Sequence, residues 1–183
     1  MEGYKTVISS QTTLTELMIP SYSNFGGKIH GGIIMGLMDK VAYACAAKHA
    51  GNYCVTASVD SINFLAPVEV GELVSLMASV NYIGGSSLVI GIRVQSENIR
   101  TQQIKHTNSS YFNMVAIDDD HKPVQVPGLI LQSQLEIKRF YEAYHRRELK
   151  RYFNQEQHRV KNDYEIAESI ELIKTQKCII DLK

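Results

Sequence analysis

The sequence predicts an α+β fold in which an antiparallel sheet wraps around one long central helix, with a charged helical extension after it. Three observations favour this fold. Glycines crowd the front of the stretch Asn24 to Ala50, and about fifteen residues follow in which only Asp39 and Lys40 are charged and the apolar residues have helical spacing. Alternating apolar and polar residues, broken by short turns, then continue to about Ile117, as in antiparallel strands. From about Ile130 charged residues dominate.

The segment before the helix, Tyr4 to Ile19, alternates roughly by two and predicts an opening strand that ends at Pro20. A glycine-bearing loop leads into the helix, and Gly51 is suited to cap its C-terminal end. The side opposite the apolar stripe carries small rather than charged residues, so we expect the helix to be buried on most sides. The stripe consists of Ile34, Leu37, Met38, Val41 and Cys45.

Four strands with short connections are expected after the helix. In the first strand the apolar residues change from odd to even positions near Asp60, which indicates a bulge or a bend. A hairpin turn is expected at residues 83–86 and a polar loop at residues 97–103. The four predicted strands are Cys54–Ala66, Leu73–Tyr82, Leu88–Ser96 and Ile104–Ile117.

The composition is that of a single globular domain with an appendage. The 183 residues are 44% hydrophobic and 21% charged, and the formal net charge is zero, so nothing in the overall charge favours nucleic acid or an anionic membrane. Cys45, Cys54 and Cys178 lack metal-ligand spacing, and the first residues lack the pattern of a signal peptide. We therefore expect free thiols, no metal site, no membrane span and a cytoplasmic location.

The C-terminal extension, residues 130–183, has the spacing of a charged amphipathic helix, and Asn162 or Asp163 could cap a second helix. Its simplest interpretation is a solvated tail, and an alternative is a helical hairpin that docks on another protomer. RNA binding through basic residues such as Arg146 and Arg147 is less favoured, because acidic residues are interleaved with them.

Asp39 is the anomaly of the central helix, because it lies among small and apolar residues away from the stripe. A carboxylate in that position is paired, has a raised pKa, or is used in chemistry. The alternative is a side chain that reaches solvent or the neighbouring Lys40. The pattern alone favours neither interpretation.

Four blocks in register resemble hotdog-fold acyl-coenzyme A (acyl-CoA) thioester hydrolases of the cytosolic type, which includes YciA-like and brain-type enzymes. The resemblance covers about residues 12–128, so we assign residues 1–129 to a hotdog domain and residues 130–183 to the extension. The closing strand departs from the family pattern between His106 and Asn113, which bears on the acyl preference. The blocks read SNFGGKIHGGIIMGLMD, VTASVDSINFLAPVEVGE, GGSS before a Val/Ile strand, and YFNMVAIDDDHKP.

The resemblance implies that the chain hydrolyses acyl-CoA without a cofactor, as a homodimer or a trimer of dimers. It assigns to Asp39 the activation of water or direct nucleophilic attack, and to Asn24 the positioning of the thioester or the water. His30, Gly31 and Gly32 stand at the helix N-terminus, where backbone amides can hold the carbonyl oxygen. Asp39 lies seven residues beyond Gly32, about 10 Å along the axis, so the family pairs it with the glycines of a partner protomer.

The coenzyme A moiety is expected to lie along polar segments of two strands and to meet basic residues. Rival interpretations are a different acyl-CoA reaction, such as hydration, and a non-catalytic acyl-CoA sensor. A cysteine nucleophile is disfavoured, because neither Cys45 nor Cys54 has an orienting partner in the sequence. The candidate coenzyme A contacts are Val55, Thr56, Ser58, Gly85, Ser86 and Ser87, with Arg93, Arg100 and Lys105 for the phosphates.

Overall fold

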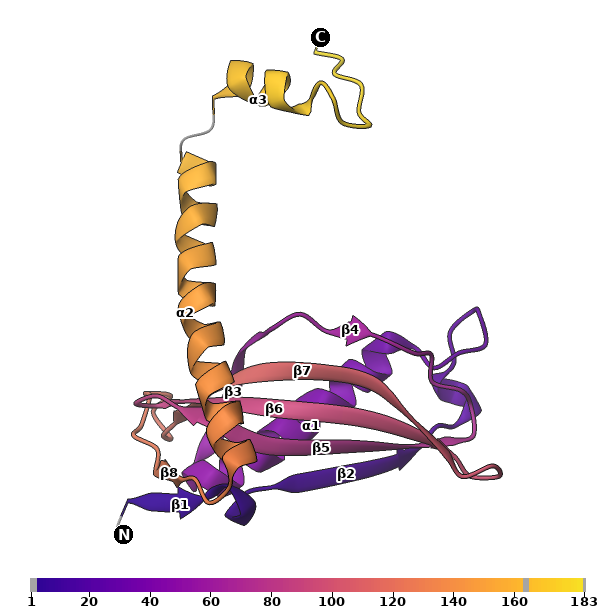
Figure 1. Ribbon diagram of the computed structural model, residues 1–183, viewed down its shortest axis with the longest axis vertical. Helices are drawn as coiled ribbons and strands as arrows, with labels where there is room; N and C mark the ends of the chain where they lie inside the picture. The colour runs from indigo at the N-terminus through magenta and orange to yellow at the C-terminus, as the bar shows by residue number, and fades with distance from the viewer. Residues whose placement is uncertain (1–2, 163–164, 183) are drawn as a thin grey trace. The chain divides into compact units, whose positions relative to one another are not determined.

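A computed structural model describes residues 3–162 and 165–182 of the chain (Figure 1). The chain divides into two compact units, Met1–Ala143 and Tyr144–Lys183. The functional division predicted at residue 129 stays a prediction. The elements of the first unit, up to the long second helix, are β1 (Tyr4–Thr6), η1 (Val7–Ser9), β2 (Thr12–Leu17), η2 (Pro20–Tyr22), α1 (Gly31–Ala50), β3 (Tyr53–Val59), β4 (Asn63–Phe64), β5 (Glu72–Ile83), β6 (Ser87–Asn98), β7 (Gln103–Ile117) and β8 (Gly128–Ile130).

The main sheet has the strand order β2-β5-β6-β7-β3, and every neighbouring pair in it is antiparallel. The short strand β4 pairs with β7 beyond the end of β3. Because β2 and β3 each have one strand neighbour, they form the two edges of the sheet. The predicted antiparallel sheet with one long central helix is confirmed, and Figure 1 shows α1 lying across one face of the curled sheet.

The core lies between α1 and that face of the sheet. Met38 and Val41 are fully buried, and they pack with the alternate residues of the central strands, such as Leu76 and Ile90. The two-residue period of a strand places these side chains toward the helix and their neighbours on the outer face. The predicted stripe of the helix is buried throughout, and Gly51 caps the helix with a left-handed φ of 74°.

The opening segment is two strands rather than one. Ser9 and Ser10 donate hydroxyl hydrogen bonds to the carbonyls of Thr6 and Val7, which closes a 3₁₀ turn between β1 and β2. The short strand β1 pairs in parallel with β8, a contact that no local sequence pattern indicated. The prediction of a single strand to Ile19 was therefore wrong, and so was the count of strands.

The segment after the helix also divides, into β3 and β4. Its register on β7 shifts between Thr56 and Ser58, earlier than the predicted irregularity near Asp60. A second one-residue shift follows where the irregularity was predicted: the Asp60 amide bonds to the Tyr111 carbonyl, whereas Asn63 of β4 pairs with Ser109. The predicted loop at residues 97–103 is shorter, because the amides of two turn residues bond to the Asn98 side chain and close a tight turn.

One face of α1 is exposed within the chain, which corrects the expectation that the helix is buried on most sides. Its residues include two glycines, a methionine, two charged residues and a tyrosine, and the ring of Tyr43 packs on Tyr53 of β3 with 5.6 Å between centroids. This exposed face, which we call the open helix face, adjoins the β3 edge of the sheet. It consists of Gly32, Met35, Gly36, Asp39, Lys40 and Tyr43.

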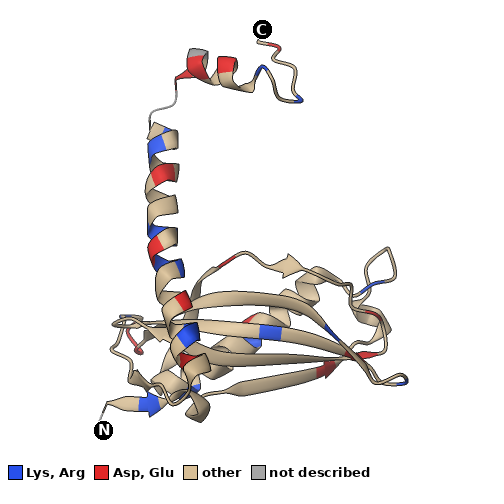
Figure 2. Ribbon diagram, viewed as in Figure 1, with Lys and Arg blue, Asp and Glu red and all other residues tan. Residues whose placement is uncertain are grey.

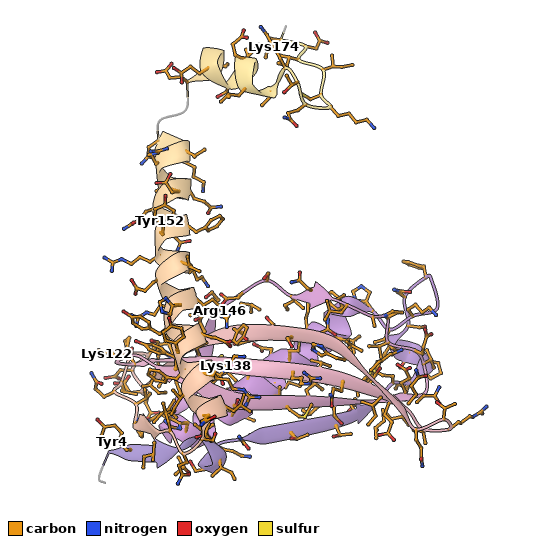
Figure 3. All side chains as sticks on the ribbon, viewed as in Figure 1. Tyr4, Lys122, Lys138, Arg146, Tyr152 and Lys174 are labelled. Atoms are coloured by element: carbon orange, nitrogen blue, oxygen red, sulfur yellow. The ribbon has the colours of Figure 1, made fainter. Side chains whose placement is uncertain are left out.

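The long helix α2 (Gln134–Asn162) starts in the first unit, where Phe140 stacks on Tyr82 and Ala143 is buried. Its later turns and α3 (Ile166–Ile173) form the second unit, with alternating charges along α2 (Figure 2) and outward side chains such as Tyr152 (Figure 3). Asn162 ends α2 rather than capping α3, whose N-cap is Glu165, and Asp163 lies outside the described residues.

None of the helices in residues 3–162 and 165–182 combines the length and the apolar character needed to cross a membrane.

Candidate functional site

Asp39 lies on the open helix face, and its carboxylate is oriented by β3. The hydroxyl of Thr56 donates a hydrogen bond of 2.6 Å to Asp39 Oδ1, and the same hydroxyl lies 3.3 Å from the sulfur of Met114. In the described part of the chain, no ion pair joins Asp39 to Lys40 or to another cation. The carboxylate is thus exposed, and a hydroxyl group fixes its direction.

The N-terminus of α1 presents backbone amides, as the sequence predicts. His30 is the N-cap, and its Nδ1 accepts a hydrogen bond of 2.9 Å from the Gly32 amide. Among the described residues the Gly31 amide has no partner, and it lies where the helix dipole is positive. The ring of Phe64 covers Gly31 so closely that a Cβ there would lie 3.1 Å from it. The helix end can therefore hold an oxygen atom beside an aromatic wall.

Asn24 organises the loop that precedes this helix end. Its Oδ1 accepts hydrogen bonds from the amides of Gly26 at 2.9 Å and Lys28 at 3.2 Å. The carbonyl of Lys28 accepts a hydrogen bond of 2.7 Å from the Asn24 amide in return. Since the side-chain oxygen is committed to the loop, the side-chain NH₂ group is the part of Asn24 that can donate to a ligand.

These groups form two clusters within one chain. Asn24, His30, Gly31 and Gly32 lie at the start of α1, and the Asp39–Thr56 pair lies about two helical turns further, about 10 Å along the axis. A thioester carbonyl held at the glycines cannot also reach that carboxylate. One chain therefore supplies two half-sites, both of which open on the face that the sheet leaves uncovered.

The predicted coenzyme A contacts lie apart from the helix N-terminus. Val55 and Ser58 are half-buried on β3. The hairpin of Gly85, Ser86 and Ser87 joins β5 to β6, and the carbonyl of Gly85 accepts from the Val126 amide at 3.1 Å. The segment that contains Val126 also reaches the C-terminal end of α1, because His49 Nε2 lies 2.8 Å from the carbonyl oxygen of Pro127. The hairpin is thus at the opposite end of α1 from the glycines.

The basic candidates are not brought to Asp39. Arg93 lies on the outer face of β6, next to Ser109 of β7, whereas the α1 side of β6 carries Ile92 and Val94. Arg100 is in the exposed turn between β6 and β7. Within one chain, neither residue is placed to hold a phosphate beside the two clusters.

Lys105 forms an ion pair of 2.8 Å with Glu72, whose side chain is almost entirely buried. Burial raises the pKa of the Glu72 carboxyl, but the Glu69 amide and the Lys105 ammonium group outweigh burial and hold that pKa below its usual range. The charge of Lys105 is therefore already matched by a carboxylate of the same chain.

The buried thiols are unsuited to nucleophilic attack. Burial raises the pKa of Cys45 to about 12 and that of Cys54 to about 11, so both are protonated at neutral pH. Across residues 3–162 and 165–182, no three His, Cys, Asp or Glu side chains gather as they would around a metal ion. Asp39 is the carboxylate that the open helix face offers.

The sequence of the chain is similar to those of several known proteins. The sequence profile described as Thioesterase superfamily matches residues 26–102. Protein VdlD of Helicobacter pylori is 41% identical over 75% of this chain and 78% of its own length. The acyl-CoA thioester hydrolase YkhA of Bacillus subtilis, called uncharacterized, is 32% identical over 70% of this chain and 74% of its own. The cytosolic acyl coenzyme A thioester hydrolase of Rattus norvegicus is 34% identical over 75% of this chain but only 37% of its own length.

The chain also resembles solved structures of acyl-CoA hydrolases. An apo-hexameric acyl-CoA thioesterase superposes with a TM-score of 0.80 at 33% identity, over 82% of this chain and 97% of that one. An acyl-CoA hydrolase of Staphylococcus aureus, in complex with butyryl coenzyme A and coenzyme A, superposes with a TM-score of 0.79 at 29% identity, over 87% of this chain and 97% of that one.

Three structures of mutants of the Staphylococcus aureus hydrolase have alanine in place of an asparagine, an aspartate and a threonine. The asparagine and the aspartate are 15 residues apart in that chain, and the aspartate and the threonine are 17 residues apart. Asn24, Asp39 and Thr56 have the same spacings here. Sequence reasoning placed Thr56 along the coenzyme A groove and missed its contact with Asp39.

Proposed function

The chain belongs to the thioesterase superfamily, among the hotdog-fold acyl-CoA thioester hydrolases, and we propose that it hydrolyses acyl-CoA to a free carboxylic acid and coenzyme A. One observation carries the proposal: the Asp39 carboxylate, oriented by the Thr56 hydroxyl, lies on the open face of the same helix whose N-terminus presents the unpartnered Gly31 amide. These are the base and the oxyanion donor that hydrolysis of a thioester requires.

The proposed reaction begins when Asp39 takes a proton from a water molecule and the oxygen attacks the thioester carbonyl carbon. The carbonyl oxygen gains negative charge and is stabilised by the Gly31 amide and the positive end of the helix dipole. The Gly32 amide joins them when the thioester oxygen displaces His30 Nδ1. The carbon–sulfur bond then breaks, and the proton held by Asp39 passes to the departing thiolate, so that the acid and free coenzyme A are released. No cofactor enters these steps.

The alternative is a direct attack by Asp39 on the thioester carbonyl, which would give an anhydride that water then opens. The two routes differ in the source of an oxygen atom. In a single turnover in ¹⁸O water, the general-base route places ¹⁸O in the fatty acid, whereas attack by Asp39 leaves the label in the carboxylate of the protein when water opens the anhydride there. We propose the general-base route, because the Thr56 hydrogen bond fixes one carboxylate oxygen toward β3.

We propose that a second protomer completes the site, so that Asp39 of one chain faces Asn24 and the glycines of the other. Two features support this arrangement. The strand β3 is a sheet edge next to the open helix face, and Gly36 on that face has open space around its Cα. Two such edges can join into one sheet with the helices side by side. A trimer of these dimers is the assembly that the hexameric relative supports.

In this dimer, the hairpin at Gly85–Ser87 and the strand segment at Val55 and Ser58 would line the path of the pantetheine arm across both protomers. A twofold axis between antiparallel helices would bring the hairpin end of one α1 near the glycine end of its partner, so that these residues could contact a substrate bound there. We propose a cytoplasmic location, which the cytosolic relative supports.

The proposal is tested by measuring thiol release from saturated acyl-CoAs of increasing chain length with a chromogenic thiol reagent. Release of one thiol per acid formed, at a rate well above the spontaneous rate, is the expected result. The chain-length profile will identify the preferred acyl group. Tight binding of acyl-CoA without thiol release would contradict the hydrolase assignment and favour a sensor.

A further inference from the structure

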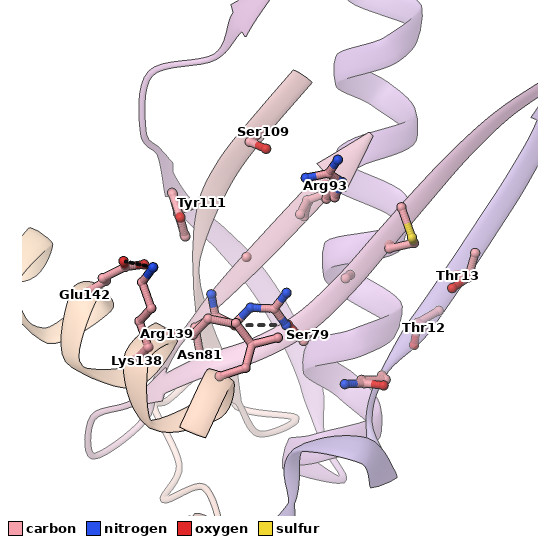
Figure 4. Close-up of a pocket in the computed structure, with 16 residues that line it drawn as sticks. Thr12, Thr13, Ser79, Asn81, Arg93, Ser109, Tyr111, Lys138, Arg139 and Glu142 are labelled. Carbon is pink, nitrogen blue, oxygen red and sulfur yellow. Dashed lines mark hydrogen bonds and ion pairs between the residues drawn. The ribbon is translucent and has the colours of Figure 1, made fainter. Parts of the chain in front are cut away.

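A cleft of about 460 Å³ lies on the outer face of the sheet, the face opposite α1. Its floor is the outer surface of β2, β5, β6 and β7, and the first turns of α2 form one wall. Figure 4 shows Lys138, Arg139 and Glu142 on the helix, with Arg93, Ser109 and Tyr111 on the strands. The volume is in the range of small-ligand sites. The Asp39 carboxylate lies on the other side of the sheet, so the cleft is separate from the proposed thioester site.

The floor of the cleft contains a buried amide with a free donor. Asn81 is the extra residue of a bulge in β5, between Val80 and Tyr82, and its side chain lies over Gly91. Any side chain at Gly91 would collide with Asn81 Nδ2, so the glycine makes the room that this amide occupies. Asn81 is 6% exposed, its Oδ1 accepts a hydrogen bond of 3.0 Å from Ser79, and its Nδ2 has no partner among the described residues.

Two guanidinium groups of the cleft have no carboxylate partner within residues 3–162 and 165–182. With the Gln95 amide oxygen turned toward Arg93, that oxygen accepts two hydrogen bonds of 3.1 Å, which orient the guanidinium without neutralising it. Arg139 is half-buried and also lacks an ion pair. The third cation, Lys138, is 3.8 Å from Glu142, and both are solvent-exposed. The cleft therefore retains about two uncompensated positive charges.

We propose that this cleft binds a small organic phosphate. A phosphate monoester carries nearly two negative charges at neutral pH, which match the two unpaired guanidinium groups, and its oxygens accept in the paired geometry that arginine presents. The Nδ2 group of Asn81 supplies a neutral donor, and the hydrogen bond from the Ser79 hydroxyl to Asn81 Oδ1 holds this amide in place. Met77 and Leu135 give the cleft an apolar part that inorganic phosphate would leave uncovered. The ligand is thus a phosphate joined to a compact apolar or aromatic group.

The binding test uses phenyl phosphate as the probe and isothermal titration calorimetry on the full-length protein. We expect saturable binding to the parent protein, at least tenfold weaker binding to Arg139→Gln and to Arg93→Gln, and no change in Arg151→Gln. The last variant removes a charge from α2 outside the cleft. Thermal melting of each variant establishes that it is folded. Absence of saturable binding to the parent, or equal affinity in the folded Arg139→Gln and Arg93→Gln variants, would overturn the proposal.

A second experiment identifies the source of the phosphate, which is either a free metabolite or the nucleotide end of coenzyme A held by another subunit. If coenzyme A is the source, it displaces phenyl phosphate, and Arg139→Gln raises KM for acyl-CoA but not for the acyl N-acetylcysteamine thioester, which lacks the nucleotide. If a free metabolite is the source, coenzyme A does not displace the probe and KM is unchanged for both substrates. Either result supports a phosphate site, and the binding test is independent of hydrolysis.

Discussion

The hydroxyl of Thr56 donates a hydrogen bond of 2.6 Å to the carboxylate of Asp39, and this contact joins β3 to α1. It fixes the direction of an exposed acid group on the helix face that the sheet leaves open. A free aspartate on a helix surface would sample several rotamers, whereas this one is held by a neighbouring strand. The contact gives a helix-surface carboxylate one preferred direction.

We expect Thr56→Val to lower kcat for acyl-CoA about tenfold with little change in KM, because it removes a hydrogen bond to a charged group that orients the base. Thr56→Ser keeps the hydroxyl and should retain most of the activity. Steady-state kinetics of the two variants make the comparison. Equal losses in both would mean that the side-chain shape at this position, rather than the hydrogen bond, is what matters.

Replacing Asp39 by Asn should lower kcat by about 10² to 10⁴, the usual contribution of a general base, while the fold is retained. Asp119→Asn, in the exposed turn after β7, is the matched control and should leave kcat unchanged. Thiol release measured on both proteins at saturating acyl-CoA gives the comparison. If Asp39→Asn keeps more than half of the parent rate, Asp39 is not the base.

The fold was predictable where periodicity is strong. The stripe of α1 and the long strands β5, β6 and β7 follow directly from apolar spacing, and Gly51 ends the helix as expected. The short parallel pair of β1 and β8 was not predictable, because it joins residues near the two ends of the first unit and each strand is only three residues long. The exposure of one face of α1 was also not predictable, because small residues are equally suited to a core and to an interface.

The roles of the candidate residues stay predictions, and their mutual arrangement could not be predicted from the sequence. The sequence places an acid group beyond a glycine-rich helix start, and the resemblance gives Asp39 and Gly32 their roles. Sequence spacing does not reveal that Thr56 reaches Asp39, that the Gly32 amide is capped by His30, or that Lys105 is paired with Glu72. Each of these contacts joins side chains whose directions depend on the packed backbone.

Lys105→Met tests whether Lys105 serves the fold rather than the coenzyme A phosphates. Removing the ammonium group leaves the Glu72 carboxylate, which is 5% exposed, without its ion-pair partner. We expect the free energy of unfolding to fall by about 2 kcal/mol, with KM for acyl-CoA unchanged. Chemical denaturation and steady-state kinetics measure the two quantities. Lys122→Met, at an exposed ion pair, should change neither, and a raised KM with unchanged stability in Lys105→Met would assign Lys105 to the substrate.

His49 should make stability depend on pH. Burial lowers its pKa from 6.5, although the hydrogen bond with the Pro127 carbonyl partly opposes this. The unfolded chain then binds a proton that the folded chain rejects, so the contribution of His49 is complete above about pH 6.5 and is lost as the pH falls toward the lower folded pKa. Denaturation between pH 7.5 and pH 5 should show this loss in the parent and in His158→Gln, an exposed control, and less of it in His49→Gln. An identical pH dependence in His49→Gln would show that other groups cause it.

The most direct measurement mixes equal amounts of two variants that should both be strongly impaired, Asp39→Asn and Asn24→Ala, under conditions that exchange subunits. If Asp39 of one protomer acts with Asn24 and the glycines of its partner, each mixed dimer contains one intact site and one doubly altered site. Random exchange should then restore about a quarter of the parent activity. A mixture no more active than either variant alone, despite demonstrated exchange, would contradict a site shared between two chains.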